Sequence, residues 1–252
     1  MPRATLYSIP GSHSAMTVQR MLELKGISYK RIDLLPVVSR LVTKVMRFPE
    51  VTIPALRIDD RRLSGSLEIS RALDEIEPNP PLFPTETTAR VAVEDAEHWG
   101  NEVLQDAVRR ILWNAIRRDR KPLGSYAKGA RIGIPIGLAV KTAAPIIAAE
   151  VRINGAEDPA VQADLAAFPA WLRRVDDWIE DGTLGGDPPN AADLQVATGL
   201  RLAMTLEDLR PFIEGRPSGD LAKRLVPDFP GHTPAILPAA WLEPLRAGDE
   251  PA

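Results

Sequence analysis

The proline at position 54 constrains the fold of this chain more than any other single residue. It follows the β-branched Ile53 and directly precedes a strand-like run over residues 55–58. Proline has no backbone N–H, so this position is typical of a sheet edge or of a cis X-Pro turn rather than a central strand. The segment therefore predicts a cis peptide bond before Pro54, with the backbone N–H and C=O of Ile53 facing an open groove where a ligand can bind.

A short hairpin and a helix follow this turn. Two aspartates at 59–60 mark the hairpin turn, and Gly65-Ser66 precedes an apolar series with helical spacing over residues 69–76. A hydroxyl at a helix N-terminus lies beside free N–H groups and the positive end of the helix dipole, which favour a carboxylate. Ser66 is therefore a candidate to hold a carboxylate, and the alternative interpretation is a plain helix cap.

The N-terminal stretch supplies the elements that precede the hairpin. Strands and helices are expected in alternation over residues 5–9, 13–25, 29–34 and 38–47. With the hairpin and a closing helix over 66–76, this is the element order of a thioredoxin-like domain.

At this point the chain resembles the glutathione transferase superfamily, and in particular its serine-type bacterial members. Four blocks are similar to that superfamily and occur in its order: LYS…SHSAMTVQRMLELKGISY, FPEVTIPAL, LSGSLEISRAL and LGGDPPNAADLQVA. The resemblance covers most of residues 4–83 and 160–215. It implies an α/β thioredoxin-like domain followed by an all-α helical domain, a homodimer, and glutathione or a related thiol as a substrate. The residues that it implies for holding this thiol are Ile53, Pro54, Gly65 and Ser66.

A proline-dense stretch at residues 77–84 divides the chain, because neither a helix nor a strand continues through so many prolines. We expect a thioredoxin-like domain over 1–77, a linker over 78–87 and a helical domain over 88–252. Long apolar stripes with helical spacing support the last of these, the first predicting a helix of about eight turns.

Two further features of the helical part are predicted. Asn190 and Asp193 have the spacing of a capping box, which accounts for both residues structurally. The segment 121–157 is rich in Gly and Pro and predicts a broken helical insertion that covers a cleft.

Composition limits the classes of partner that the chain is expected to bind. With 31 basic and 34 acidic residues the net charge is −3, which predicts no nucleic-acid partner. The apolar stretch 132–151 is interrupted by prolines and charges, so we expect no membrane span and no membrane partner. The N-terminus has no apolar signal region, which favours a cytoplasmic protein.

Cysteine is absent, and this fixes where any thiol chemistry must come from. With no cysteine in the chain, the protein has no disulfide, no thiolate metal site and no cysteine-based redox mechanism. His98 and His232 are too isolated to predict a metal site. A reacting thiol must therefore arrive with the ligand.

The resemblance places the catalytic group at the start of the first helix. A serine there can donate a hydrogen bond to the sulfur of a bound thiol and so favour the nucleophilic thiolate. The serine position of the superfamily falls on Ser12, with Ser14 as the second candidate and His13 as a neighbouring polar group that tunes either hydroxyl. The alternatives are a helix cap for Ser12 and a solvated loop histidine for His13.

One position departs from the superfamily pattern. Most relatives carry Glu, Gln or Asp where this chain has Gly65, and the loss of a charge-assisted bond to the α-amino group of the ligand costs about 1.5–3 kcal/mol of affinity. The preferred function is transfer of a glutathione-type thiol to an electrophilic, mainly apolar small molecule. The alternatives are a non-catalytic binding protein, or a thiol-dependent isomerase or dehalogenase of the zeta and theta type.

Overall fold

The computed structural model describes residues 4–130, 133 and 135–248. Its N-terminal part is built on a four-stranded sheet of β1 (Ala4–Ser8), β2 (Tyr29–Asp33), β3 (Ala55–Ile58) and β4 (Arg61–Ser64), in the order β2-β1-β3-β4. β1 pairs parallel with β2 and antiparallel with β3, and β3 pairs antiparallel with β4. The parallel pair requires a crossover, which the first helix provides.

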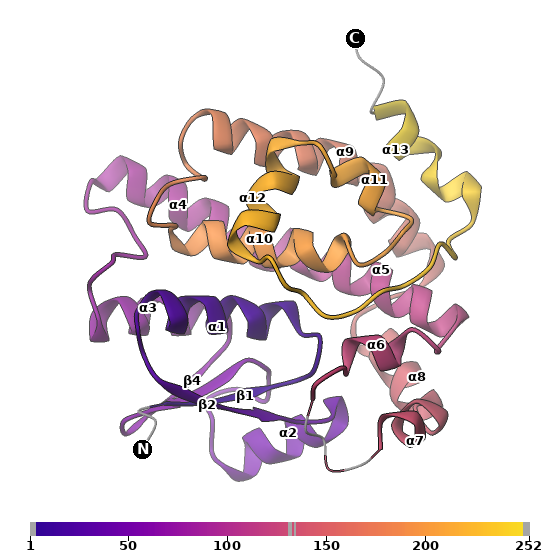
Figure 1. Cartoon of the computed structure of the whole chain (residues 1–252), viewed down its shortest axis with the longest axis horizontal. Coiled ribbons are helices and arrows are strands. Elements are labelled where there is room, and N and C mark those ends of the chain that lie inside the picture. Colours follow the sequence, from indigo (N-terminus) through magenta and orange to yellow (C-terminus); the bar gives the residue numbers. More distant parts are fainter. Residues whose placement is uncertain (1–3, 131–132, 134, 249–252) are drawn as a thin grey trace.

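Helices cover both faces of this sheet (Figure 1). α1 (His13–Leu24) and α3 (Ser66–Ile76) pack between the sheet and the rest of the chain, and α2 (Pro36–Val45) lies on the other face. Under α2 a small apolar cluster forms around Tyr7 and Phe48, whose rings lie 5.5 Å apart. The predicted thioredoxin-like order is confirmed, with boundaries that differ from the predicted ones by at most two residues.

The helical part begins with one long helix, as predicted. It runs through α4 (Thr87–Trp99), a π-helical turn (Gly100–Leu104) and α5 (Gln105–Arg118). The π-helical turn was not predicted, since apolar spacing alone does not reveal an i to i+5 bond. The later helices are α9 (Asp158–Glu180), α10 (Ala191–Ala203), α11 (Arg210–Ile213), α12 (Pro217–Leu225), a 3₁₀ turn (Ala239–Leu242) and α13 (Glu243–Gly248).

α10 is the central helix of this part, and nearly all of its residues are buried. Its start confirms the predicted capping box, because the Asn190 side chain accepts from the Asp193 backbone and the Asp193 carboxylate accepts from the Asn190 backbone, both at 2.9 Å. The Asp193 carboxylate also accepts from the backbone N–H of Gly185. Burial raises the pKa of this carboxyl, and the hydrogen bonds that it accepts from backbone N–H groups oppose the rise.

The segment 121–157 is the broken helical insertion that the sequence predicts. It consists of α6 (Leu123–Tyr126), α7 (Ile136–Lys141) and α8 (Ala144–Ile153), which project beside the sheet at the lower right of Figure 1. Residues 131, 132 and 134 of this segment lie outside the described residues.

The proline-dense stretch between α3 and α4 contains no helix or strand, and Lys25 fixes it. The Lys25 ammonium is fully buried and donates to the Asp74 carboxylate at 2.8 Å and to the carbonyls of Glu77 and Pro80. The apolar core continues without interruption from the sheet to the helices, and includes Leu82 and Phe83 of this stretch. The two parts of the chain therefore share one core.

Candidate active site

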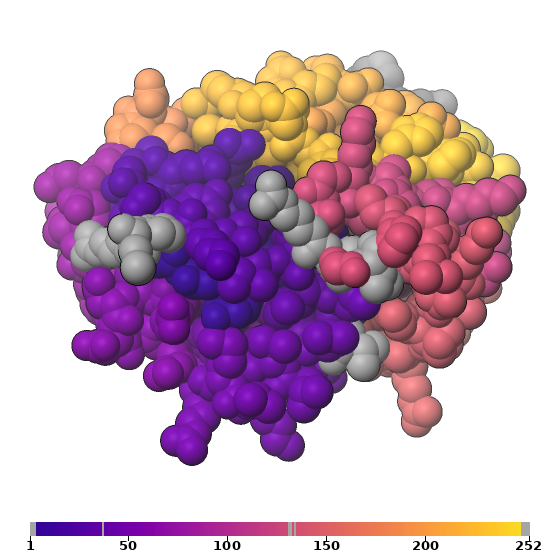
Figure 2. Space-filling model, turned by 60° about the horizontal axis from the view of Figure 1, so that its bottom comes forward, coloured from indigo at the N-terminus to yellow at the C-terminus, as the bar shows by residue number. Residues whose placement is uncertain are grey.

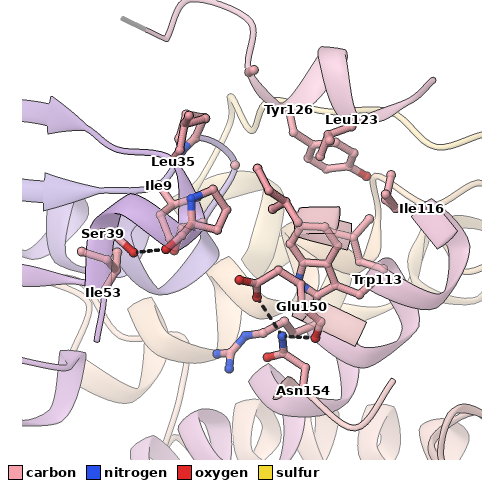
Figure 3. Close-up of a pocket in the computed structure, with 18 of the residues that line it drawn as sticks. Ile9, Leu35, Ser39, Ile53, Trp113, Ile116, Leu123, Tyr126, Glu150 and Asn154 are labelled. Carbon is pink, nitrogen blue, oxygen red and sulfur yellow. Dashed lines mark hydrogen bonds between the residues drawn. The ribbon is translucent and has the colours of Figure 1, made fainter. Parts of the chain in front are cut away.

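A large cavity lies between the edge of the sheet region and the helical insertion. Its volume is about 430 Å³. One wall comes from the β1–α1 loop, the start of α2 and the Pro54 turn, and the other from α5, α6, α7 and α8. Figure 3 shows these walls facing each other, with Ile9, Leu35 and Ile53 on one side and Trp113, Ile116, Leu123 and Tyr126 on the other. Most of the lining is apolar, so the cavity suits an apolar small molecule.

Ser12 lies at the wall of this cavity, where α1 begins. It is the N-cap of α1, and its hydroxyl oxygen accepts the Ala15 backbone N–H at 3.2 Å. The hydroxyls of Ser12 and Ser14 are 3.1 Å apart. When Ser14 donates to Ser12, the Ser12 hydroxyl hydrogen is free for a group in the cavity. Ser12 is thus a helix cap that also lines the cavity, so its role as a cap does not exclude donation to a group bound there.

His13 corrects one expectation from the sequence, because it is not a solvated loop histidine. It is the first residue of α1, and only 3% of its surface is exposed. Burial and the nearby Arg109 guanidinium hold the pKa of the imidazole well below its usual value, whereas a hydrogen bond with the Gln105 backbone acts in the opposite direction. Its Nε2 atom is buried without a hydrogen-bond partner. His13 is therefore neutral, and helix packing rather than loop composition decides its environment.

Ile53 and Pro54 are joined by the predicted cis peptide bond. Ile53 lines the cavity across from the apolar helix wall, which agrees with the predicted groove (Figure 3). Pro54 is buried behind it and does not line the cavity; its carbonyl accepts the Gly65 N–H at 2.9 Å. The Pro54 turn thus connects the cavity wall to the start of α3.

Gly65 and Ser66 lie outside the lining of the cavity. Gly65 is the N-cap of α3 and has a φ of 79°, a backbone conformation that favours glycine. The helix-cap interpretation of Ser66 is therefore wrong, since Ser66 is the first helical residue. Its side chain is buried, and its hydroxyl donates to the Asn101 carboxamide at 3.3 Å. Asn101 comes from the π-helical turn, which sequence reasoning missed.

The cavity also contains charged residues that the sequence analysis did not select. Arg109 lines it, forms an ion pair with Asp106 at 3.2 Å, and donates to the Gln105 side chain. Burial lowers the pKa of Arg109, and the carboxylates of Asp106 and Glu150 oppose this. Asp106 precedes Arg109 by one turn of α5, whereas Glu150 comes from α8, so only the tertiary structure brings the second carboxylate to this guanidinium.

Two aromatic residues of the helical part shape the cavity. Trp113 lines it, whereas Trp241 does not and instead lies under the Arg118 guanidinium. Tyr126 was not selected from the sequence; its hydroxyl bonds to those of Thr205 and Thr233, both at 2.8 Å. These bonds hold the insertion against the C-terminal helices.

The described residues contain no group of three or more His, Asp or Glu that could hold a metal ion. His98 lies 3.7 Å from Glu102, and the His232 ring bonds to Glu207 at 2.7 Å, so each histidine has a carboxylate neighbour on the surface. Within the described ranges no helix has the length and apolar character needed to cross a membrane.

Comparisons with known proteins agree with this architecture. Residues 6–81 match the family model described as glutathione S-transferase, N-terminal domain. No curated protein matches the sequence significantly.

Solved structures of low sequence identity share the fold over the whole chain. Glutathione transferase F7 from Populus trichocarpa is 14% identical with a TM-score of 0.61, and the match covers 98% of this chain and 99% of that one. The beta-etherase LigF from Sphingobium sp. strain SYK-6 is 16% identical, with a TM-score of 0.57 and coverage of 99% and 96%. A theta class glutathione S-transferase from Xanthomonas axonopodis pv. citri, solved with glutathione bound, is 15% identical, with a TM-score of 0.55 and coverage of 90% and 98%. Residues 6–81 of this chain therefore match the glutathione S-transferase N-terminal domain, and the chain as a whole has the fold that these solved structures share.

Proposed function

We propose that this protein transfers a glutathione-type thiol to an electrophilic, mainly apolar small molecule bound in the cavity. One observation carries the proposal. The hydroxyl of Ser12 lies at the N-terminus of α1 on the wall of a largely apolar cavity, with Ile53 in the same lining. A thiol that pairs with the Ile53 backbone would place its sulfur near this hydroxyl.

The chemistry requires a thiolate, because the thiolate and not the thiol is the nucleophile. Ser12 would donate its hydroxyl hydrogen to the sulfur, and the dipole of α1 would add to this stabilisation. The thiol proton passes to solvent, the sulfur lone pair forms the bond to the electrophilic carbon, and the electrons of the broken bond leave with the displaced group or enter the acceptor. His13 is buried and neutral, so it adds no positive charge beside the sulfur.

The peptide portion of the thiol would extend from Ile53 toward the start of α3. Gly65 lacks a side chain that could bind the α-amino group, and the Ser66 hydroxyl is already engaged with Asn101. A carboxylate at this position would have to take over that hydroxyl or use the free backbone N–H groups of the first turn of α3. We expect Ser66→Ala to weaken thiol binding by about 1–2 kcal/mol while turnover at saturation changes little.

Replacement of Ser12 tests the proposal. We expect Ser12→Ala to return the pKa of the bound thiol toward its free value of about 8.5, and to lower turnover more than thiol affinity. The measurements are the ultraviolet absorbance of the bound thiolate against pH, and steady-state kinetics with glutathione and an aromatic electrophile. Ser39→Ala is the matched control, because Ser39 lines the same cavity but already donates its hydroxyl to the Pro36 carbonyl.

The outcome of this test separates the candidate functions. If Ser12→Ala keeps the rate and the pH profile of the wild type, Ser12 is only a helix cap and Ser14 becomes the candidate donor. If glutathione at millimolar concentration produces no thermal stabilisation of the wild type, the transferase proposal fails. Gly65 favours the second candidate function, a non-catalytic binding protein that uses the apolar cavity alone. A thiol-dependent isomerase or dehalogenase would use the same Ser12 with a different electrophile.

The assembly and the division of the chain are also proposed on the basis of the superfamily. We propose a homodimer, a cytoplasmic location, and domains over 1–77 and 88–252 with a linker over 78–87. The core that joins the two parts limits their independence. Size-exclusion chromatography with light scattering tests the dimer directly.

A further inference from the structure

α2 exposes apolar residues on its outer face, although Val42 packs inward on the cluster around Tyr7 and Phe48. Its buried positions include the polar residues Ser39 and Thr43, which are 4% and 0% exposed, and their hydroxyls donate to carbonyls of the same helix. Its apolar residues Val38, Leu41 and Val45 are instead 43%, 63% and 70% exposed. They are spaced by three and four residues and so share one face. This exposed apolar face is unpartnered within the described chain.

α7 also has an apolar side chain on the surface. Leu138 of α7 is 52% exposed, and both α2 and α7 contribute residues to the cavity lining. Figure 1 shows α2 and α7 on the same side of the molecule, and the rotation in Figure 2 brings this side forward. Exposed apolar side chains therefore lie on two elements that are far apart in the sequence and that each supply other residues to the cavity lining.

Charge is segregated onto the same two segments. Residues 34–49 and 120–149 together contain eight Lys or Arg and no Asp or Glu. The rest of the chain contains the other 23 of the 31 basic residues and all 34 acidic residues. The exposed cations among their described residues are Arg40, Lys44, Arg47, Arg120, Lys121, Lys128 and Lys141. None of these forms an ion pair with a described carboxylate, whereas arginines elsewhere, such as Arg61, Arg110 and Arg216, do.

We propose that the basic apolar surface defined by Val38, Leu41, Val45, Leu138, Lys44, Arg47, Lys128 and Lys141 binds the surface of an anionic lipid bilayer. Apolar side chains interleaved with Lys and Arg fit the boundary between headgroups and acyl chains, where the apolar groups enter and the cations contact lipid phosphates. A second copy of the same surface would bring like charges together, which disfavours symmetric self-association. No described helix spans a membrane, so the contact is peripheral.

This inference departs from the absence of a membrane partner that the sequence predicts. The net charge of −3 conceals the basic segments, because it averages over the whole chain. In the bound orientation α2 and α7, which also supply residues to the cavity lining, face the bilayer. The inference is independent of any thiol chemistry.

Vesicle sedimentation tests the proposal with the full chain. We expect the protein to sediment with vesicles of phosphatidylcholine and phosphatidylglycerol, and not with phosphatidylcholine alone, with binding that weakens as salt increases. The double variant K44E/K141E changes one cation on α2 and one on α7, and should lower the partition coefficient on the order of tenfold or more. L41S/V45S should lower it by about tenfold through loss of inserted apolar surface.

Matched controls come from exposed residues on other helices. Val91 of α4 is 51% exposed, and Arg173 and Arg246 of α9 and α13 are exposed. V91S and R173E/R246E should leave the partition coefficient unchanged. As a second measurement, brominated lipid should quench the fluorescence of the added tryptophan of L41W more than that of V91W. This measurement still tests the proposal if a charge-reversal variant fails to fold.

Three results would overturn the proposal. One is absence of binding to anionic vesicles, which would leave an acidic protein surface as the alternative partner. Another is an equal loss of binding in the control variants, which would show a nonspecific effect of net charge. The last is equal quenching of L41W and V91W.

Discussion

His13 shows how one buried residue links stability to pH. Burial holds the pKa of its imidazole well below the unfolded value of about 6.5, so the unfolded chain binds a proton that the folded chain does not. The number of bound protons is then larger in the unfolded state, and the free energy of unfolding falls as pH drops below about 6.5. At higher pH both states are neutral and the residue contributes no pH dependence.

We therefore predict that His13→Gln flattens the pH dependence of stability. The wild type should lose up to about 1.4 kcal/mol of unfolding free energy per pH unit from this residue below pH 6.5 or so, and the variant should lack this part. Urea unfolding at pH 7.5 and pH 5.5, conditions chosen on either side of that value, measures it. His98→Gln, which replaces an exposed histidine, is the matched control for the substitution itself. A slope in His13→Gln equal to that of the wild type would contradict this account.

Ser14 is the residue expected to orient Ser12. It is 5% exposed, and its hydroxyl lies 3.1 Å from that of Ser12. Ser14→Ala should leave the Ala15 N–H as the one described partner of the Ser12 hydroxyl, so turnover should fall about tenfold with little change in thiol affinity. Ser14→Thr retains the hydroxyl and should recover most of the rate. Steady-state kinetics measures this effect. If Ser14→Ala leaves turnover unchanged, Ser14 contributes only to packing.

At the level of elements, the fit between α6 and the loop before the C-terminal helices shapes the cavity. Tyr126 lies against Gly231, which has a φ of 112°, and a Cβ placed on Gly231 would overlap the Tyr126 ring. The Tyr126 hydroxyl is held by Thr205 and Thr233 on the other side. The ring therefore has little room to move, and burial raises the pKa of its hydroxyl.

Gly231→Ala should consequently displace Tyr126 and destabilise the insertion. The expected cost is backbone strain plus an overpacking term of about 1–3 kcal/mol. Gly215→Ala is the matched control, because Gly215 also has a positive φ, of 82°, but nothing lies within 4 Å of an added Cβ. Thermal unfolding and the affinity for an apolar fluorescent ligand measure the difference. Equal effects of the two substitutions would show that Tyr126 does not define this wall.

On the scale of the whole molecule, buried polar contacts join the sheet region to the helices. The hydroxyls of Thr17 in α1 and Thr198 in α10 are 2.6 Å apart and fully buried. In addition, Ser70 donates to the buried Glu97 at 2.7 Å, and Arg71 forms an ion pair with the same carboxylate. Burial raises the pKa of Glu97, and Arg71 opposes the rise. With the shared apolar core, these contacts couple the two parts.

We predict that the chain unfolds in a single cooperative transition and that Thr17→Val lowers its midpoint. Loss of the contact to Thr198 should cost about 1 kcal/mol, since Thr198 still donates to its own helix. The double variant Thr17→Val with Thr198→Val should cost less than the sum of the single variants. Urea unfolding followed by far-ultraviolet circular dichroism and by tryptophan fluorescence provides the test. Two separate transitions would show that the parts unfold independently.

The sequence by itself determined the elements of this protein and the order in which they occur. Pro54, the alternating strands and helices, the capping box at Asn190 and the broken segment 121–157 depend on local backbone preferences and apolar spacing, which neighbouring residues set. The absence of cysteine likewise excludes protein-based thiol chemistry on composition alone. The candidate hydroxyls Ser12 and Ser14 could also be identified from the sequence, because they lie at the start of a helix that the pattern predicts.

Only the tertiary structure decided which side chains surround the cavity and which are removed from it. It buried His13, engaged Ser66 with Asn101, and brought Glu150 into one lining with Arg109. It also placed the apolar face of α2 on the surface, where helical spacing alone would have assigned it to the core. The physical reason is that burial and electrostatic environment depend on contacts between segments far apart in the chain, and local sequence preferences do not specify those contacts.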